Sequence, residues 1–206
     1  QRTLRREGHL TPEQRQDLGI AAEETDRMKR LLGDLLTLSR SDCSRLELVR
    51  QPIDPLPLLQ EVVAQSCQTL ARPITLEHHW PAIHQPRQIL ACPDQLKQVL
   101  LNLIENAHKY SPNAAPIEVS LERNAEGSSI SVQDHGDGIL PDELPLIFDR
   151  FYRGSNSHRQ SGSGLGLSVV QLLVEAMGAT ITVKSQPGQG SCFSMHWLAN
   201  DRHSPA

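Results

Sequence analysis

The amino-acid sequence predicts an α/β protein: a two-layer α/β sandwich with a mixed, largely antiparallel sheet, preceded by a long bundle helix. Several segments alternate apolar and polar residues with period two, as strands covered on one face do. Amphipathic helical segments are interspersed with these strands, which favours a layer of helices against the sheet. A heptad-like apolar repeat runs through residues 11–40, before the first strand pattern, and predicts the bundle helix.

The long helix is predicted to begin at Thr11. Thr11 suits the N-cap, Pro12 suits the first helical position and Gln14 completes a capping box, while Gly8 ends a preceding helix. Small and apolar residues then step by three and four and form an apolar seam: Leu18, Ala21, Thr25, Met28, Leu32, Leu35 and Ser39, widened by Leu31 and Leu38. We expect a second copy of the chain to bury this seam in a homodimer. The alternative is packing against the protein's own globular domain.

Further elements follow from periodicity and from turn residues. A linker is expected over residues 39–45, followed by a short strand around Leu46 and Leu48. Asp54 is the expected N-cap of a helix over residues 56–70. The other predicted helices are Pro93–Tyr110 and 166–177, and strands are predicted at 74–79 and 88–92. The clearest alternation is carried by Ile117, Val119 and Leu121; Ile130 and Val132; Ile181 and Val183; and Phe193, Met195 and Trp197.

Composition excludes several classes of protein. The net charge of −4 and the aromatic content of 3% argue against nucleic-acid binding, which favours basic surfaces and stacking platforms. No apolar run approaches the roughly 20 residues that cross a bilayer. We therefore expect a cytoplasmic location, with membrane contact only through segments outside this chain, which starts at Gln1 and is interpreted as a fragment. The cysteines have no paired spacing and are expected to be reduced: Cys43, Cys67, Cys92 and Cys192.

Two asparagines inside an apolar helix are the first candidate site. Asn102 and Asn106 are four residues apart and share a helix face, where unpartnered amides would be costly. An amide oxygen is a suitable ligand for Mg²⁺, which also keeps waters and phosphate oxygens. Lys109 can act as a point charge on a phosphate, and Tyr110 offers an aromatic face. The alternative is that both asparagines are simply exposed helix positions.

Two glycine-containing stretches are the next candidates. Asp134-His135-Gly136-Asp137-Gly138 follows an alternating strand, and an ionised carboxylate there suits an exocyclic amine such as that of adenine. Gly162-Ser163-Gly164-Leu165-Gly166-Leu167 opens a helix, whose N-terminal N–H groups attract phosphate. The polar residues 150–161 before it are expected to form a lid anchored by Phe148 and Phe151. The alternatives are an Asp-Gly turn and a flexible linker, and Gly188-Gln189-Gly190-Ser191 fits a hairpin turn.

In their order these stretches resemble the N, G1, F, G2 and G3 boxes of sensor histidine kinases, within the gyrase, Hsp90 and MutL ATPase superfamily. The resemblance covers residues 46–198. Residues 11–40 resemble the second helix of the dimerisation and histidine-phosphotransfer domain. Together, the two resemblances imply a Bergerat-type ATP-binding fold, with phosphotransfer helices in residues 1–42, the catalytic domain in 43–199 and a flexible tail in 200–206. They also imply ATP and Mg²⁺ as cofactors, a homodimer, and a response-regulator receiver domain as partner.

The resemblance also assigns roles to single residues. Asn106 would bind Mg²⁺, with Asn102 assisting, and Asn102, Asn106 and Lys109 would form the catalytic set. Asp134 would receive the adenine amine. The further nucleotide-binding residues would be Lys109, Tyr110, Gly136, Gly138, Ile139, Phe151, Arg153, Gly162, Gly164, Leu165, Gly166, Leu167 and Ser191. Gly188 and Gly190 would let the last strands pack near the adenine.

The expected activity is transfer of the ATP γ-phosphoryl group to a histidine. None of the nine histidines lies in an H-E-x-R-T-P-like box, so the acceptor is expected before Gln1. Hydrolytic members of the superfamily carry a water-activating Glu where this chain has Asn102, and Glu105 is expected to face elsewhere. A conformational ATPase and a dimerising scaffold that only binds ATP are the alternatives. His108 and His135 depart from the pattern, and each is expected to be packed or solvated.

Overall fold

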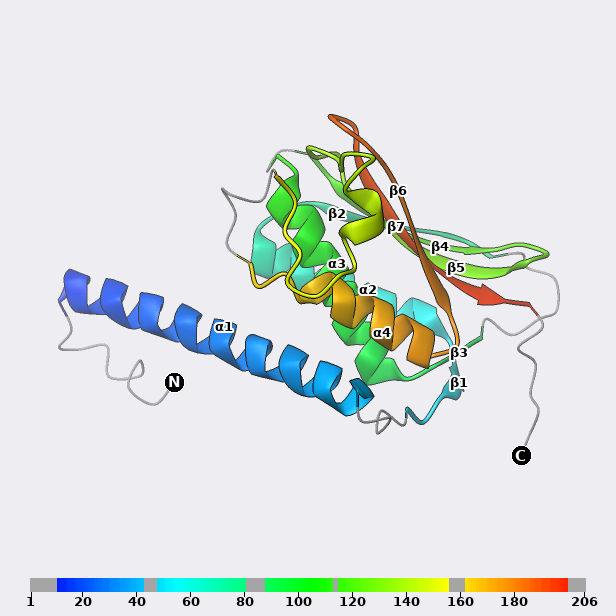
Figure 1. Ribbon diagram of the computed structural model, residues 1–206, viewed down its shortest axis with the longest axis horizontal. Helices are drawn as coiled ribbons and strands as arrows, with labels where there is room; N and C mark the ends of the chain where they lie inside the picture. The colour runs from blue at the N-terminus through cyan, green and yellow to red at the C-terminus, as the bar shows by residue number, and fades with distance from the viewer. Residues whose placement is uncertain (1–10, 43–47, 81–87, 113–114, 156–161, 200–206) are drawn as a thin grey trace.

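The computed structural model describes residues 11–42, 48–80, 88–112, 115–155 and 162–199. Helix α1 (Pro12–Asp42) extends away from a unit of packed helices and strands (Figure 1). Its capping box is confirmed, since the Thr11 N–H donates to Gln14 Oε1 at 3.0 Å and the Gln14 N–H donates to Thr11 Oγ1 at 3.2 Å. The predicted helix end at Gly8 and the tail lie outside the described residues.

Among the described residues, five strands form one sheet in the order β2-β4-β5-β7-β6. They are β2 (Ile74–His79), β4 (Ile117–Arg123), β5 (Gly127–Gln133), β6 (Thr180–Gln186) and β7 (Gly190–Leu198). Strands β2 and β4 pair in parallel, and the other three pairs are antiparallel. The predicted mixed and largely antiparallel sheet is therefore confirmed.

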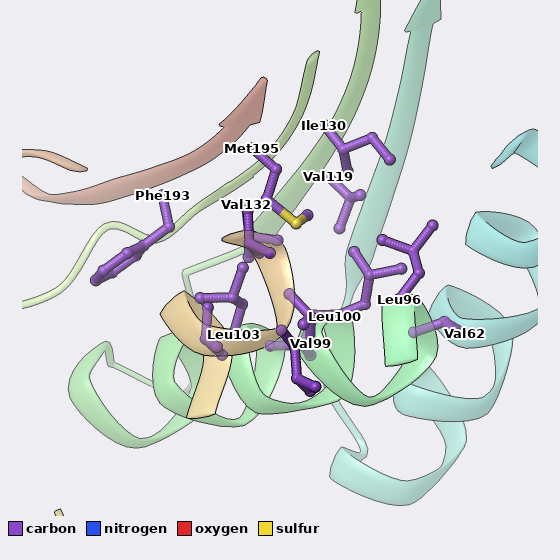
Figure 2. Close-up of a cluster of buried hydrophobic side chains, with 14 of the residues drawn as sticks. Val62, Leu96, Val99, Leu100, Leu103, Val119, Ile130, Val132, Phe193 and Met195 are labelled. Carbon is purple, nitrogen blue, oxygen red and sulfur yellow. The ribbon is translucent and has the colours of Figure 1, made fainter. Parts of the chain in front are cut away.

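Helices α2 (Pro55–Leu70), α3 (Pro93–Tyr110) and α4 (Gly166–Ala176) form a second layer on one face of this sheet (Figure 1). The Asp54 cap is as predicted, because its side chain accepts a hydrogen bond from the Leu56 N–H at 3.0 Å. Between the layers, Val119 and Ile130 of the sheet face Leu100 of α3 (Figure 2), and all three side chains are at most 1% exposed. This core fixes α3 against the sheet.

The segment between α1 and α2 differs from the prediction. Helix α1 continues through residues 39–42, part of the expected linker, and 43–47 lie outside the described residues. Leu48 belongs to no strand; the strand is β1 (Gln51–Ile53), which pairs antiparallel with β3 (Ile89–Ala91). A strand forms where a partner backbone is available, and alternation within one segment does not reveal that partner.

Helix α1 presents two adjacent apolar surfaces. Leu38 is buried in the core of the α/β unit, Leu31 packs against that core, and α1 contacts α4. The apolar seam faces outward in the single chain: Met28 is 62%, Leu32 61% and Leu35 44% exposed. The two leucines that the sequence suggested as part of the seam thus dock α1 on its own domain. No helix in the described part of the chain meets the length and apolarity needed for a membrane span.

Candidate functional site

A cavity and a groove adjoin at the C-terminal half of α3. The cavity, of about 120 Å³, lies among α3, the loop after β5 and the segment before residue 155. The groove, of about 580 Å³, lies among α1, α3 and the start of α4. Asn106, Tyr110, Arg153 and Leu167 line both spaces. One ligand with two chemically different ends can therefore occupy both.

Asp134 is the acidic group of the cavity. It directly follows β5, is 5% exposed, and its N–H donates to the Ser191 carbonyl oxygen at 2.9 Å. Its Oδ1 accepts a hydrogen bond from the Gly136 N–H at 2.8 Å. Burial raises the pKa of Asp134, and the hydrogen bond from Gly136 acts against that rise. Because a carboxylate only accepts hydrogen bonds, this wall of the cavity selects a donor.

The loop after Asp134 is clamped between two other segments. A Cβ on Gly136 would lie 2.0 Å from the Tyr110 carbonyl oxygen, at the end of α3. Gly138 has φ +67°, and a Cβ there would lie 2.0 Å from the Gln186 carbonyl oxygen at the end of β6. Both contacts exclude a larger residue. Gly138 lines the cavity, whereas Gly136 does not and holds the loop against α3.

Arg72 supports this arrangement and had no sequence signal. It is 4% exposed, although an arginine before a strand is usually solvated. Its guanidinium donates to Ser111 Oγ at 2.6 Å and to the carbonyl oxygens of Pro112 at 2.8 Å and Ala115 at 2.9 Å. These bonds tie down the chain just after Tyr110, against which the Gly136 loop packs.

The polar face of α3 forms one wall of the groove. Asn102, Asn106 and Lys109 all line it, as the helical spacing predicted. Asn102 Nδ2 is buried and has no hydrogen-bond partner in the described part of the protein. A buried orphan amide is costly unless a ligand or water completes it. The Lys109 ammonium lies 4.0 Å from Glu105 Oε2.

The glycine-rich stretch forms the opposite wall. Gly162, Gly164, Gly166 and Leu167 line the groove, and α4 begins at Gly166, so its first backbone N–H groups lie beside it. Gly164 has φ +73°, and a Cβ there would lie 2.7 Å from the Phe151 carbonyl carbon. A helix N-terminus carries a partial positive charge and free N–H donors. This wall is suited to an anion.

Of four other predicted nucleotide-binding residues, two line the cavity and two line neither space. Ile139 and Ser191 line the cavity, and both are tied to Ser185 Oγ: the Ile139 N–H donates to it at 2.8 Å and Ser191 Oγ lies 3.0 Å from it. Leu165 and Phe151 line neither space. The Leu165 side chain is 2% exposed in the core, and Phe151 is 64% exposed with φ +64°.

Several lining residues were missed by the sequence analysis. The further cavity residues are Glu143, Ile147, Tyr152, Gly154 and Phe193. Glu143 Oε1 accepts hydrogen bonds from the Ser155 N–H at 2.8 Å and Oγ at 2.6 Å, and these bonds lower the Glu143 pKa. This carboxylate holds Gly154 and Ser155 beside the cavity. Only Phe193 had a signal, as a core position of an alternating strand.

Glu105 lies in the groove, whereas His108 and His135 line neither space. Glu105 was expected to face away from Asn106, but it lines the same groove, where it is held by Arg30. His135 lies outside both spaces, with Nε2 3.0 Å from Glu118 Oε1. His108 Nδ1 is buried without a partner in the described structure, and burial lowers the His108 pKa. Neither histidine lines the cavity or the groove.

The fold and this site define a class of protein, which a comparison with known families identifies. Residues 91–201 match the family described as Histidine kinase-, DNA gyrase B-, and HSP90-like ATPase, which is more than half of the chain. The chain therefore belongs to that ATPase family. Residues 2–44 match the His Kinase A (phospho-acceptor) domain.

Individual relatives include a sensor protein and a sensor histidine kinase. Sensor protein SrrB of Staphylococcus aureus is 29% identical over 185 residues, which are 87% of this chain and 31% of SrrB. The structure of full-length ShkA in complex with AMPPNP has 30% identity and a TM-score of 0.73, over 93% of this chain and 41% of ShkA. The structure of the mycobacterial sensor histidine kinase MprB has 26% identity and a TM-score of 0.60, over 71% of this chain and 95% of the MprB chain. The predicted resemblance to sensor histidine kinases is confirmed, and the chain spans about a third of the SrrB length.

Proposed function

We propose that this chain is the ATP-binding catalytic part of a sensor histidine kinase. It would transfer the γ-phosphoryl group of ATP to a histidine, for relay to an aspartate of a response-regulator receiver domain. The observation that carries the proposal is that the two spaces share lining residues such as Asn106 and Tyr110: a cavity with a buried carboxylate adjoins a groove with amides, a lysine and a helix N-terminus. A purine amine and a polyphosphate require these two environments in this order.

At the adenine end, Asp134 would accept the exocyclic amine. The apolar cavity walls include Ile139, Ile147 and Phe193, which exclude water around the ring. A hydrogen bond to an ionised, desolvated acceptor is stronger than one between neutral groups. The ShkA relative holds the ATP analogue AMPPNP, which supports ATP as the ligand of the equivalent site here.

At the phosphate end, the described residues fit a hydrated Mg²⁺ that arrives with ATP. No group of three or more His, Cys, Asp or Glu side chains in the described segments could hold a metal alone. Asn106 would supply an amide oxygen, and Asn102 would complete its orphan amide on a metal-bound water or phosphate. Bound Mg²⁺ would supply neutralisation of phosphate charge. Lys109 and the N–H groups of α4 would hold the phosphate oxygens, which leaves the γ-phosphorus open to an imidazole nitrogen.

The groove also favours phosphoryl transfer over hydrolysis. Hydrolytic members of the superfamily need a carboxylate base at the position of Asn102, and an amide cannot accept a proton from water. Glu105 is near, but its carboxylate contacts the Arg30 guanidinium at 2.9 Å. That carboxylate is already engaged by a cation in this arrangement. An entering histidine needs no such base on α3.

The test supplies the acceptor separately. The protein is incubated with γ-labelled ATP and a helical peptide carrying an H-E-x-R-T-P-like box, and transfer of label to the peptide histidine is measured. We expect label that is stable in base and labile in acid. Release of labelled phosphate at the same rate without the peptide would instead favour the conformational ATPase, and ATP binding without either reaction would favour the scaffold.

Asp134→Asn is expected to weaken ATP binding by roughly 10- to 100-fold, because the amide loses the charge that strengthens the bond to the amine. The same variant should be more stable than the parent protein without nucleotide. Burial raises the pKa of Asp134 above its unfolded value of 3.8, so the ionised carboxylate costs stability above its folded pKa, and the cost fades as pH falls through that pKa. The gain in Tm should be largest near pH 7 and shrink toward about pH 4.

Calorimetric melts at both pH values and an ATP titration at neutral pH check this expectation. Ser131→Ala is a matched control, since Ser131 pairs with Ser194 on the open face of the sheet at 2.8 Å, away from the cavity. A lower Tm for Asp134→Asn at neutral pH would contradict the account of its burial.

A further inference from the structure

Two cations converge on the Glu105 carboxylate, and one of them comes from α1. Arg30 Nη1 lies 2.9 Å from Glu105 Oε1 and 3.0 Å from Oε2. Lys109 Nζ lies 4.0 Å from the same Oε2. Arg30, Glu105 and Lys109 all line the groove, together with Asn102 and Asn106. A positive charge carried by α1 therefore stands at the polyphosphate end of the proposed ATP site.

From this geometry we propose that Arg30 is a phosphate-contacting residue of the nucleotide site, which α1 contributes and which Glu105 holds ready when no nucleotide is bound. The inference rests on the proposed function, because it requires a polyphosphate in the groove. A triphosphate with its metal carries more negative charge than one carboxylate and offers several acceptor oxygens to the guanidinium. Arg30 then exchanges Glu105 for phosphate oxygens, and Lys109 does the same.

The exchange is feasible because Arg30 is anchored at its backbone and exposed at its side chain. The neighbouring Leu31 packs on the core, and Leu38, two turns on, is buried in it, so the helix stays docked. The Arg30 side chain is 60% exposed and that of Glu105 34% exposed. An ion pair this open contributes little to stability, so its loss is a small cost against a charge-assisted bond to phosphate.

One consequence is that ATP binding and α1 docking stabilise each other. If docked α1 supplies a phosphate contact, the triphosphate favours the docked position by the same factor, since coupling between two equilibria is reciprocal. Adenosine reaches only the cavity and has no phosphates for Arg30. It should therefore leave α1 unaffected.

The test compares affinities of Mg-ATP, Mg-ADP and adenosine by titration calorimetry. Arg30→Ala is expected to weaken the binding of Mg-ATP by roughly tenfold and the binding of Mg-ADP by less. The affinity for adenosine should not change. Lys29→Ala is the matched control: it removes the same charge from the preceding residue of α1, which is exposed and does not line the groove, and should change ATP affinity by less than about twofold. Arg30→Lys should recover part of the loss.

Glu105→Gln is the second arm. It removes the competing carboxylate and should tighten ATP binding a few-fold, and the gain should be smaller in an Arg30→Ala background, as a double-mutant cycle measures. Equal effects of Arg30→Ala and Lys29→Ala would overturn the proposal, and so would equal losses for ATP and adenosine. If the parent protein binds neither ligand, the proposed function itself fails. If it binds both and Arg30 is indistinguishable from Lys29, only this inference fails.

Discussion

Replacing Asn106 by alanine is expected to lower the affinity for Mg-ATP by roughly a hundredfold or more, because loss of a residue that merely supports a metal ligand already costs about 10- to 100-fold and Asn106 is proposed as a ligand itself. Asn106 lines both the cavity and the groove, so in the proposed binding mode its amide would lie where adenosine ends and the phosphates begin. Alanine removes the only side-chain oxygen that this position offers to a hard cation. Titration calorimetry with Mg-ATP measures the loss, and circular dichroism checks that α3 is intact.

Controls separate metal binding from cavity shape. Asn106→Asp keeps an oxygen ligand and should retain more Mg-ATP affinity than alanine does. Adenosine without metal should bind Asn106→Ala with a loss of at most a few-fold, since Asp134 and the cavity walls remain. Tight Mg-ATP binding by Asn106→Ala would contradict the proposal that Asn106 is a ligand of Mg²⁺.

The helix that carries these asparagines was largely predictable because its determinants are local. Pro93 opens it, six apolar positions repeat with helical spacing, and the observed bounds Pro93–Tyr110 match the prediction. The same holds for the Thr11 capping box and the Asp54 cap, where each hydrogen bond spans two or three residues. Local chemistry is readable from a single sequence.

What could not be predicted depends on contacts between distant residues. Strand β1 exists because Gln51 meets Ala91, forty positions later, whereas alternation placed a strand at Leu46 and Leu48. Arg72 is buried because its guanidinium donates to the carbonyl oxygens of Pro112 and Ala115 in the chain after Tyr110. Such a pairing appears only once the fold brings the two segments together.

The site was predicted as a set of motifs rather than as a surface. Asn102, Asn106, Asp134 and Gly138 line the cavity or the groove because each motif marks its own backbone geometry. Glu143 and Arg30 were missed because they have no motif, and each reaches the site from an element that the sequence does not place beside it. Gly136 belongs to its motif but acts through packing against Tyr110.

Leu32→Asp is expected to abolish the homodimer that we propose for α1. Leu32 lies in the centre of the exposed seam, between Met28 and Leu35, and each is at least 44% exposed in the single chain. An exposed apolar row of this kind on a helix favours burial against a second copy. Leu31 and Leu38 are not available to a second copy, because they already pack on the α/β unit.

Burying an ionised carboxylate in the seam, with loss of the leucine contact, should raise the dimer dissociation constant by roughly a hundredfold or more. Val49→Asp is the matched control: it makes the same change of charge at an apolar residue that is 83% exposed and lies beyond the end of α1. Light scattering at several protein concentrations should show a dimer for the parent and for Val49→Asp, and a monomer for Leu32→Asp with unchanged adenosine affinity. A parent protein that stays monomeric at the highest concentration would mean that the seam needs a different partner from a second copy of these residues.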